Sequence, residues 1–282
     1  MSGRPDGLVL VDKPTGVTSH DVVDVVRRTL GTRKVGHAGT LDPMATGLLL
    51  VGVGRATRLL RYFADLPKTY DGTARLGVET DTLDADGTVV RSAEVHVSRE
   101  DLTRAFGARV GASTQRPPAF SAVKVGGRKL YEAARAGQVL EAPPRPIRID
   151  AFEVRSFEGA DVVFLVTCSG GTYIRTLLAD VGTDLGCGAH LTRLRRTRIG
   201  PYRVEDAVDP GAVGRPAPVE AAVAHLPRIE VSEDEARAAS HGSILAPAGL
   251  DGPYGVFTPR GRLVGVYRDD GAKAVPEVIL PG

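Results

Sequence analysis

Residues 33–47, RKVGHAGTLDPMATG, constrain the fold of this chain more than any other segment. Glycines and a proline interrupt the segment, so it fits the pattern of neither a helix nor a strand. It nevertheless lies between well-patterned elements. A loop with special backbone geometry has to be held by the elements around it, and loops of this kind often carry function.

The elements around this loop mix strands and helices. Residues 8–11 are an apolar run typical of a buried strand, and residues 70–76 alternate like a half-buried strand. Thr18 and Asp21 have the spacing of a capping box, which predicts a helix that ends at Gly31. A second amphipathic helix is expected further along, with one apolar face made of Ile174, Leu177, Leu178, Val181 and Leu185.

Residues 115–148 differ in character from the segments on either side. Prolines stand near both ends of this stretch. The cations within it include Lys124, Arg128, Lys129, Arg135, Arg145 and Arg148. We therefore expect a basic insertion in a core that resumes at Ile149.

The C-terminal part of the chain predicts a second domain. Residues 209–226 are rich in Ala, Pro and Val, which is typical of a linker. From Ile229 onward, short strand-like runs separated by Gly and Pro predict a small all-β domain. A large domain followed by a small one is also the expected organisation for a chain of 282 residues.

Charge and cysteine content exclude several classes of protein. The net charge is only +2, so any affinity for nucleic acid has to come from local clusters of Lys and Arg. Cys168 and Cys187 are too far apart for a CxxC motif and the six histidines do not pair at ligand spacing, so no metal is expected. No apolar run approaches the roughly 20 residues that cross a bilayer. Together with two reduced cysteines, this indicates a cytoplasmic protein.

Asp42 is the main candidate for chemistry. Taken alone, an Asp before a Pro in a glycine-rich loop is typical of a turn. The full stretch is longer and rarely met by accident: Gly36-His37-Ala38-Gly39-Thr40-Leu41-Asp42-Pro43, followed by Ala45-Thr46-Gly47-Leu48-Leu49. It closely resembles the signature of the TruB-type tRNA pseudouridine synthases.

The resemblance runs from about Leu8 to Val208, with the family's motifs in the family's order. The similar segments are Asp12-Lys13-Pro14-Thr15-Gly16-Val17-Thr18-Ser19, Lys68-Thr69-Tyr70, Thr80-Asp81-Thr82 with Asp86-Gly87, Ser121-Ala122-Val123-Lys124, Gly170-Gly171-Thr172-Tyr173-Ile174-Arg175, and Leu191-Thr192 with Leu194-Arg195-Arg196-Thr197. The C-terminal residues match more loosely, as a shortened PUA-like module would.

The resemblance implies an α+β chain with the pseudouridine synthase fold. This fold has a large mixed, mainly antiparallel sheet flanked by helices, a basic RNA-clasping insertion at about residues 115–148, and a small C-terminal β domain. Residues 1–225 would be the catalytic domain and residues 226–282 a PUA-like RNA-binding domain. The implied activity is isomerisation of uridine 55 in the T-arm of tRNA, by base flipping, in a monomer with no cofactor and no metal.

The resemblance also assigns roles to residues. Asp42 is the catalytic carboxylate, Arg175 its ion-pair partner, and Tyr70 the aromatic residue that stacks on the flipped uracil and whose hydroxyl can move a proton. Whether Asp42 attacks the ribose or the base stays open. The residues expected to bind substrate are His37, Gly39, Thr40, Lys13, Lys68, Tyr173, Leu194, Lys124, Arg135, Arg195 and Arg196. With Arg193, Arg198 and Arg203, the last two are expected to hold phosphates.

Two other functions stay open at this stage. An RNA N-glycosidase would use a similar carboxylate but release the base, so free uracil would identify it. A noncatalytic RNA-binding module would act through the C-terminal domain. Asp42, Tyr70 and Arg175 together argue against such a module, because binding alone does not require a buried carboxylate facing RNA phosphates.

Overall fold

The computed structural model describes residues 5–138 and 140–280. Its centre is a large sheet whose main path consists, in spatial order, of β1 (Gly7–Lys13), β3 (Thr46–Val53), β12 (Ala189–Ile199), β4 (Lys68–Leu76), β11 (Asp161–Cys168), β10 (Arg145–Glu158) and β7 (Gly111–Gln115). Neighbouring strands on this path are antiparallel except β12 with β3, which are parallel. The expected α+β fold with a mixed, mainly antiparallel sheet is therefore confirmed.

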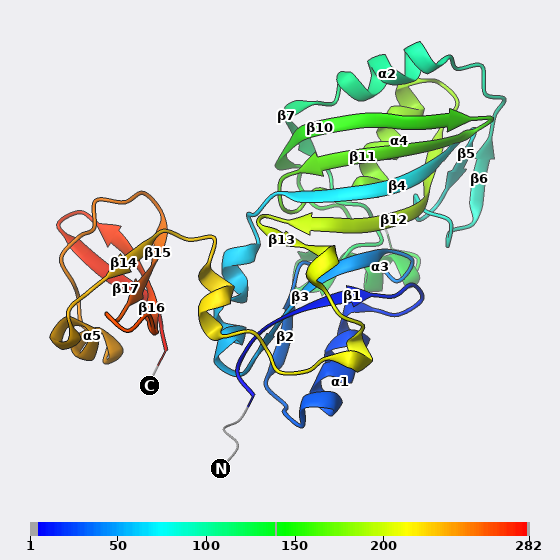
Figure 1. Cartoon of the computed structure of the whole chain (residues 1–282). Helices are drawn as coiled ribbons and strands as arrows, with labels where there is room; N and C mark the ends of the chain where they lie inside the picture. The colour runs from blue at the N-terminus through cyan, green and yellow to red at the C-terminus, as the bar shows by residue number, and fades with distance from the viewer. Residues whose placement is uncertain (1–4, 139, 281–282) are drawn as a thin grey trace.

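Helices cover this sheet and bury its apolar residues. α4 (Ile174–Asp184) packs against β12, and α2 (Arg99–Gly107) packs against β10 (Figure 1). α1 (Ser19–Leu30) has the predicted capping box and ends at Gly31 in the left-handed conformation. Together these helices and the sheet place the carboxyl end of β2 (Val35–Ala38), the start of β3 and the start of α4 around the catalytic candidates.

The segment 33–47 is not irregular throughout, so that expectation is wrong in part. Residues Val35–Ala38 form β2, which pairs antiparallel with β3, and Thr46 already belongs to β3. Gly36 lies opposite Gly52 in this pairing, and the helix η1 (Gly54–Phe63) packs closely over both through Leu60. The sequence pattern missed β2 because its glycine is used for close packing. The true loop is residues 39–45.

The basic insertion is shorter than expected. β10 begins at Arg145, not at Ile149, because residues 145–149 pair with β7. Arg145 and Arg148 therefore belong to the sheet, and the insertion spans residues 116–144. Within it lie the hairpin of β8 (Lys124–Val125) and β9 (Arg128–Lys129) and the short helix α3 (Leu130–Arg135).

Residues 209–226 are not a free linker, which corrects a second expectation. They contain the short helices η3 (Pro210–Ala212) and η4 (Val219–Val223) after η2 (Val204–Asp206) and the short strand β13 (Tyr202–Arg203). Ala217 exchanges two backbone hydrogen bonds with Leu8 of β1, and Ala222 is fully buried. The Ala and Val side chains that suggested a linker instead pack this segment onto β1 and η1.

The C-terminal domain contains the expected small sheet, in the order β14 (Arg228–Glu230), β15 (Pro253–Phe257), β16 (Leu263–Asp270) and β17 (Lys273–Ile279). It is not all-β, because Ser232 and Glu235 form a capping box that begins α5 (Glu233–Ser240). One apolar cluster joins this domain to the rest of the chain, since Leu263 and Val278 pack with Leu59 and Phe63 of η1.

A second small sheet lies beside the large one. It consists of β5 (Val78–Thr80) and β6 (Val89–Ser92), and the turn between them carries Asp84. In the described part of the chain, no helix is long and apolar enough to cross a membrane. The same residues contain no group of three or more His, Cys, Asp or Glu side chains placed to hold a metal ion.

Candidate active site

The loop of residues 39–45 carries Asp42. Hydrogen bonds to residues 13–19, at and before the start of α1, hold this loop. Lys13 Nζ donates to the carbonyl of Pro43 at 3.2 Å, and the Gly16 amide donates to the same carbonyl at 2.8 Å. Ser19 Oγ donates to the Leu41 carbonyl at 3.1 Å and accepts from the Leu41 amide at 2.9 Å. The motif of residues 12–19 therefore fixes the backbone on both sides of Asp42.

Asp42 forms an ion pair with Arg175. Its Oδ2 lies 3.0 Å from Nε of Arg175, and the Arg175 side chain is only 5% exposed whereas that of Asp42 is 40% exposed. Burial raises the pKa of the Asp42 carboxyl above its ordinary value, while the Arg175 charge acts in the opposite direction. The structure thus presents a carboxylate that is open to a substrate on one side and paired on the other.

Asp84 also binds Arg175, which the sequence did not reveal. Its Oδ2 lies 3.3 Å from Nη1 of Arg175, and its side chain is 7% exposed. Oδ1 of Asp84 accepts a hydrogen bond from Thr82 Oγ1 at 2.5 Å. Leu83 beside it has a φ of 64°, a left-handed conformation that is uncommon for this residue type. The only sequence signal was a run of carboxylates between residues 79 and 86, and their spacing does not show which of them faces inward.

Two further bonds complete the surroundings of the Arg175 guanidinium. Nη1 donates to the Thr82 carbonyl at 2.7 Å, and Nη2 donates to the Phe120 carbonyl at 2.9 Å. Phe120 lies in the insertion, so this segment contacts Arg175 directly. With both carboxylates and both carbonyls in place, little rotational freedom is left to the guanidinium.

The start of α4 is held by Gln115 at the end of β7. The Gln115 side chain accepts from the Tyr173 amide at 2.8 Å and donates to the Tyr173 carbonyl at 3.0 Å. Tyr173 precedes Arg175 by two residues, so these bonds fix the turn from which Arg175 projects. Sequence reasoning missed Gln115, because a polar residue at a strand end carries no distinctive signal. Tyr173 itself packs against the apolar residues of the insertion.

Tyr70 and Leu194 lie in the same apolar cluster as Leu41, next to the Asp42 loop. Tyr70 is 7% exposed, and burial raises the pKa of its hydroxyl. Arg196 lies directly opposite Tyr70 across β12 and β4, and its charge lowers the pKa of the Tyr70 hydroxyl against the effect of burial. The arrangement places an aromatic ring and a hydroxyl beside the Asp42 carboxylate.

His37, Gly39 and Thr40 lie at the rim of this site. His37 ends up on β2, half-buried, and burial lowers the pKa of its imidazole. Its Nδ1 is buried and has no hydrogen-bond partner among the described residues. Gly39 and Thr40 are exposed at the start of the loop, where a substrate can reach them.

Models of known protein families match most of this chain. The family model described as TruB family pseudouridylate synthase (N terminal domain) matches residues 27–174. A model for the tRNA pseudouridylate synthase B C-terminal domain matches residues 175–215, and one for the C terminal of tRNA pseudouridine synthase II matches residues 226–281. The chain belongs to the TruB family.

Curated relatives of this TruB family member cover nearly the whole chain. A Mycolicibacterium paratuberculosis protein named tRNA pseudouridine synthase B is 46% identical over 98% of both chains. A protein of the same name from Thermobifida fusca is 47% identical over 98% of this chain and 99% of its own length. Family membership therefore rests on the full length and not on one motif.

Solved structures share the fold of this TruB family chain. A chain in the crystal structure of a Cbf5-Nop10-Gar1 complex superposes with a TM-score of 0.77 at 28% identity, covering 98% of this chain and 86% of that one. A chain in the structure of an H/ACA RNP bound to a substrate RNA containing 2'-deoxyuridine gives a TM-score of 0.75 at 26% identity, covering 98% and 85%. The pseudouridine synthase fold is thus confirmed.

Several cations expected to bind substrate lie inside this TruB family chain. Lys13 is fully buried and donates to three backbone carbonyls, and Lys68 is 5% exposed and also donates to three. Burial lowers the pKa of each lysine to about 8. Arg196 is 1% exposed. This placement does not fit direct contact with RNA, so these three residues support the site from within.

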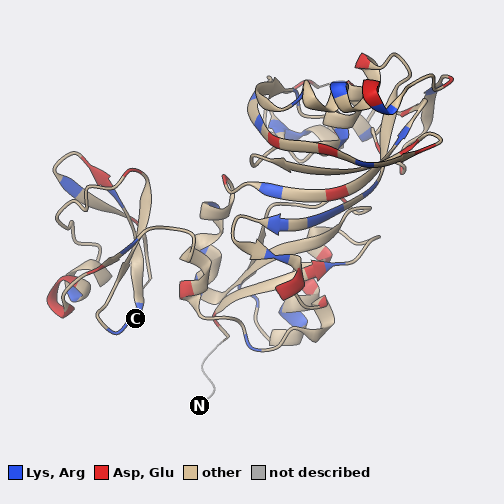
Figure 2. Ribbon diagram, turned by 45° about the horizontal axis from the view of Figure 1, so that its top comes forward, with Lys and Arg blue, Asp and Glu red and all other residues tan. Residues whose placement is uncertain are grey.

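Other cations remain at the surface. Lys124 and Arg135 are exposed in the insertion, and Arg193 and Arg198 are exposed on β12. Arg195 is half-buried and forms a bidentate pair with Asp12, at 3.0 and 2.6 Å. Figure 2 shows charges of both signs over the whole molecule, in keeping with the small net charge.

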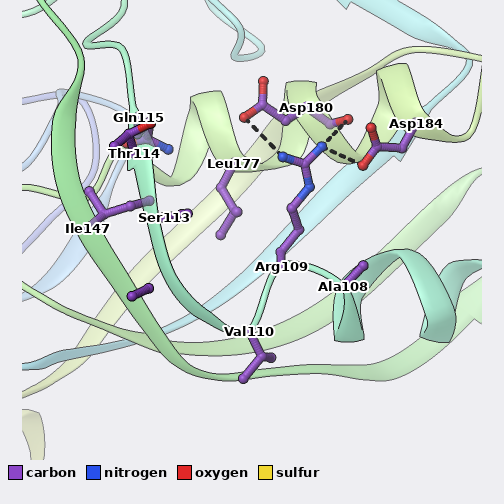
Figure 3. Close-up of a pocket in the computed structure, with 11 residues that line it drawn as sticks. Ala108, Arg109, Val110, Ser113, Thr114, Gln115, Ile147, Leu177, Asp180 and Asp184 are labelled. Carbon is purple, nitrogen blue, oxygen red and sulfur yellow. Dashed lines mark hydrogen bonds and ion pairs between the residues drawn. The ribbon is translucent and has the colours of Figure 1, made fainter.

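One hollow among the described residues has neither Asp42, Tyr70 nor Arg175 in its lining. It has a volume of about 260 Å³ between β7 and α4, and its lining includes none of the residues expected to bind substrate (Figure 3). Within it Arg109 forms ion pairs with Asp180 and Asp184 of α4. These pairs brace the chain after α2 against α4, and we assign the hollow no role in the reaction.

Proposed function

We propose that this chain isomerises uridine 55 in the T-arm of tRNA to pseudouridine, with Asp42 as the catalytic residue. The observation that carries the proposal is the Asp42 carboxylate, partly exposed and paired to a buried Arg175, in the fold of a pseudouridylate synthase family. The curated relatives are named tRNA pseudouridine synthase B, which supports tRNA as the substrate.

The reaction breaks the N1–C1′ bond of uridine, turns the uracil and joins its C5 to C1′. Nothing is consumed, because the proton that leaves C5 is balanced by a proton gained at N1. Asp42 stabilises or attacks the electron-poor centre that forms, the role carboxylates have in glycoside hydrolysis. Arg175 keeps this carboxylate aimed, and the ring of Tyr70 stacks on the flipped uracil. Either the ribose or the base can be the centre that Asp42 attacks.

RNA binding would be divided among three parts of the chain. Exposed cations of the insertion and of β12 would contact phosphates around the flipped nucleotide. His37, Gly39, Thr40, Tyr173 and Leu194 would surround the nucleotide itself. Residues 226–282 would act as a PUA-like RNA-binding domain beside a catalytic domain of residues 1–225, in a monomer of the cytoplasm.

Incubation of the purified chain with unmodified tRNA transcripts tests this proposal. We expect pseudouridine at position 55 only, no free uracil, and none of either with Asp42→Asn. Release of uracil would indicate an RNA N-glycosidase instead. Tight binding of the RNA by the wild-type chain without any change in it would indicate a binding module.

A further inference from the structure

Arg196 is a buried cation that has no carboxylate partner among residues 5–138 and 140–280. It is the largest fully buried side chain among the described residues. In that part of the chain it donates hydrogen bonds to two backbone carbonyls, and it lies directly opposite Tyr70 on the neighbouring strand. Burying a guanidinium without an anion destabilises the folded chain, so we expect Arg196 to have a role that offsets this cost. Phosphate binding cannot be this role, since the buried side chain is not accessible to RNA.

The bonds of Arg196 connect three elements that meet at the site. Nε donates to the Leu48 carbonyl of β3 at 2.8 Å, and Nη2 donates to the Gly39 carbonyl at the start of the Asp42 loop at 2.7 Å. Tyr70 is its cross-strand partner on β4. The backbone is also tightly placed, because a side chain at Gly47 would come within 2.3 Å of the Arg196 carbonyl oxygen. A shift of Arg196 would therefore move both the loop and the tyrosine.

We propose that Arg196 is a positioning residue that holds the hydroxyl of Tyr70 for proton transfer and joins it to the Asp42 loop through the Gly39 carbonyl. This inference rests on the proposed function and refines the role of Tyr70 in it. A guanidinium is suited to this task, since its planar set of donors can serve a carbonyl and a hydroxyl at once and stays charged throughout.

The proton balance shows why a donor beside Tyr70 is useful. When the N1–C1′ bond breaks, the hydroxyl of Tyr70 gives its proton to N1 and becomes a phenolate. After C5 has joined C1′, the phenolate takes the proton from C5 and the tyrosine is restored. Burial raises the pKa of Tyr70 and so opposes the phenolate, whereas the positive charge of Arg196 acts in the opposite direction and favours it. Arg196 is thus the group that makes this cycle accessible in an apolar pocket.

The test compares Arg196→Met and Arg196→Lys with Arg198→Met, an exposed arginine on the same strand. We expect the single-turnover rate on tRNA to fall about a hundredfold in Arg196→Met, the scale of lost general acid–base catalysis. Part of the rate should return in Arg196→Lys. The salt dependence of RNA binding should stay as in the wild type for both Arg196 variants, and only Arg198→Met should reduce it. A reduced salt dependence in Arg196→Met would overturn the inference and restore a phosphate contact.

Two further measurements separate positioning from simple structural support. The rate of Arg196→Lys should depend on pH differently from that of the wild type, which a loss of folded protein cannot mimic. In a Tyr70→Phe background, Arg196→Lys should lower the single-turnover rate little further, because the hydroxyl that Arg196 positions is gone. Effects that multiply in the double variant would overturn the inference, and this comparison remains valid if Arg196→Met fails to fold.

The wild type and Asp42→Asn are assayed beside these variants. A wild type that forms no pseudouridine would overturn the proposed function itself. An active wild type with an equally active, folded Arg196→Met would overturn only the role of Arg196.

Discussion

Asp84 and Asp42 bind the same guanidinium through different nitrogens. Asp42 lies 3.0 Å from Nε of Arg175, and Asp84 lies 3.3 Å from Nη1. The side chain of Asp84 is 7% exposed and that of Asp42 is 40% exposed, so only Asp42 can meet a substrate. Asp84 is therefore the residue that orients Arg175, and Arg175 in turn orients Asp42.

Asp84→Asn should lower turnover without weakening RNA binding. The amide keeps the shape but loses the charge that holds Nη1, so Arg175 can turn away from Asp42. We expect a fall of about tenfold or more in the single-turnover rate, since small displacements of catalytic groups cost that much. Asp84→Ala should also lower the thermal midpoint, because it leaves a buried charge less well paired. The matched control is Asp86→Asn, two residues away and exposed; equal losses in the two variants would contradict this role.

Asp42→Asn should abolish pseudouridine formation while leaving the fold as stable as before or more so. Burial raises the pKa of this carboxyl, so the folded chain binds its proton more tightly than the unfolded chain does. The stability that the protonated carboxyl contributes is therefore lost as pH rises through its raised pKa. At neutral pH the charged carboxylate destabilises the folded chain. Removing it should not lower the thermal midpoint, which calorimetry measures.

The raised pKa of Asp42 also predicts how the single-turnover rate depends on pH. The reaction needs the carboxylate form, so the single-turnover rate should fall on the acidic side at a pH above that expected for an ordinary aspartate. A rate that stays constant down to the ordinary range would show that burial does not govern Asp42 in solution.

The sequence predicted the Asp42–Arg175 pair and the local caps better than the residues that support them. The capping box of Thr18 and Asp21, the helix after Gly171 and the Asp42–Arg175 pair are all present. These depend on local spacing or on a long motif. Asp84 and Gln115 were missed because their partners lie far along the chain, and only the folded sheet brings them together.

The cations illustrate the same limit. Arg195 and Arg196 are neighbours in a basic run, and sequence alone gave them one role. On a strand they point to opposite faces, so Arg195 reaches Asp12 at the surface while Arg196 lies in the core. The boundaries of the insertion were also misjudged, since proline did not prevent residues 145–149 from pairing with β7.

His225 should make the packing of its own segment on η1 sensitive to acid. Its Nε2 lies 3.0 Å from the Tyr62 carbonyl, and burial lowers the pKa of the imidazole. Below about pH 6.5 the unfolded chain takes up a proton that the folded chain resists, so stability should fall there as pH decreases. His225→Gln should reduce this loss of thermal stability, whereas His96→Gln, at an exposed position, should behave like the wild type. A wild type and His225→Gln with the same pH dependence would show that this histidine is not the sensor.

The insertion should gain protection when RNA binds. Its own core is small, built around Val123, Leu130 and Ala142, and most of its other side chains are exposed. Few apolar contacts imply easy local opening, so amides of residues 120–138 should exchange quickly in the free chain. Addition of a T-arm stem-loop should slow them, while amides of β17 serve as the control. Equally slow exchange with and without RNA would contradict a clasp.

Recognition should depend on the folded T-arm and not on the local bases alone. A net charge of +2 cannot attract RNA broadly, so exposed cations such as Lys124, Arg193 and Arg198 have to contact phosphates arranged by a stem-loop. Each such contact should contribute about 0.7–0.9 to the slope of log affinity against log salt. Arg193→Ala and Arg198→Ala should each flatten the slope by about one contact. Arg195→Ala should flatten this slope less, because Asp12 already neutralises Arg195.

The choice of uridine should be independent of these arginines. Stacking and edge contacts around Tyr70 and Asp42 read the flipped base, and phosphate contacts carry no base information. An isolated T-arm stem-loop should therefore react nearly as well as tRNA, and Arg193→Ala should slow both without creating new modified positions. A linear strand with the same bases should react poorly, since its phosphates are not held in the arrangement that the exposed cations match. If that strand reacted as fast as the stem-loop, the surface cations would serve only nonspecific attraction, and the specificity would lie wholly in the pocket.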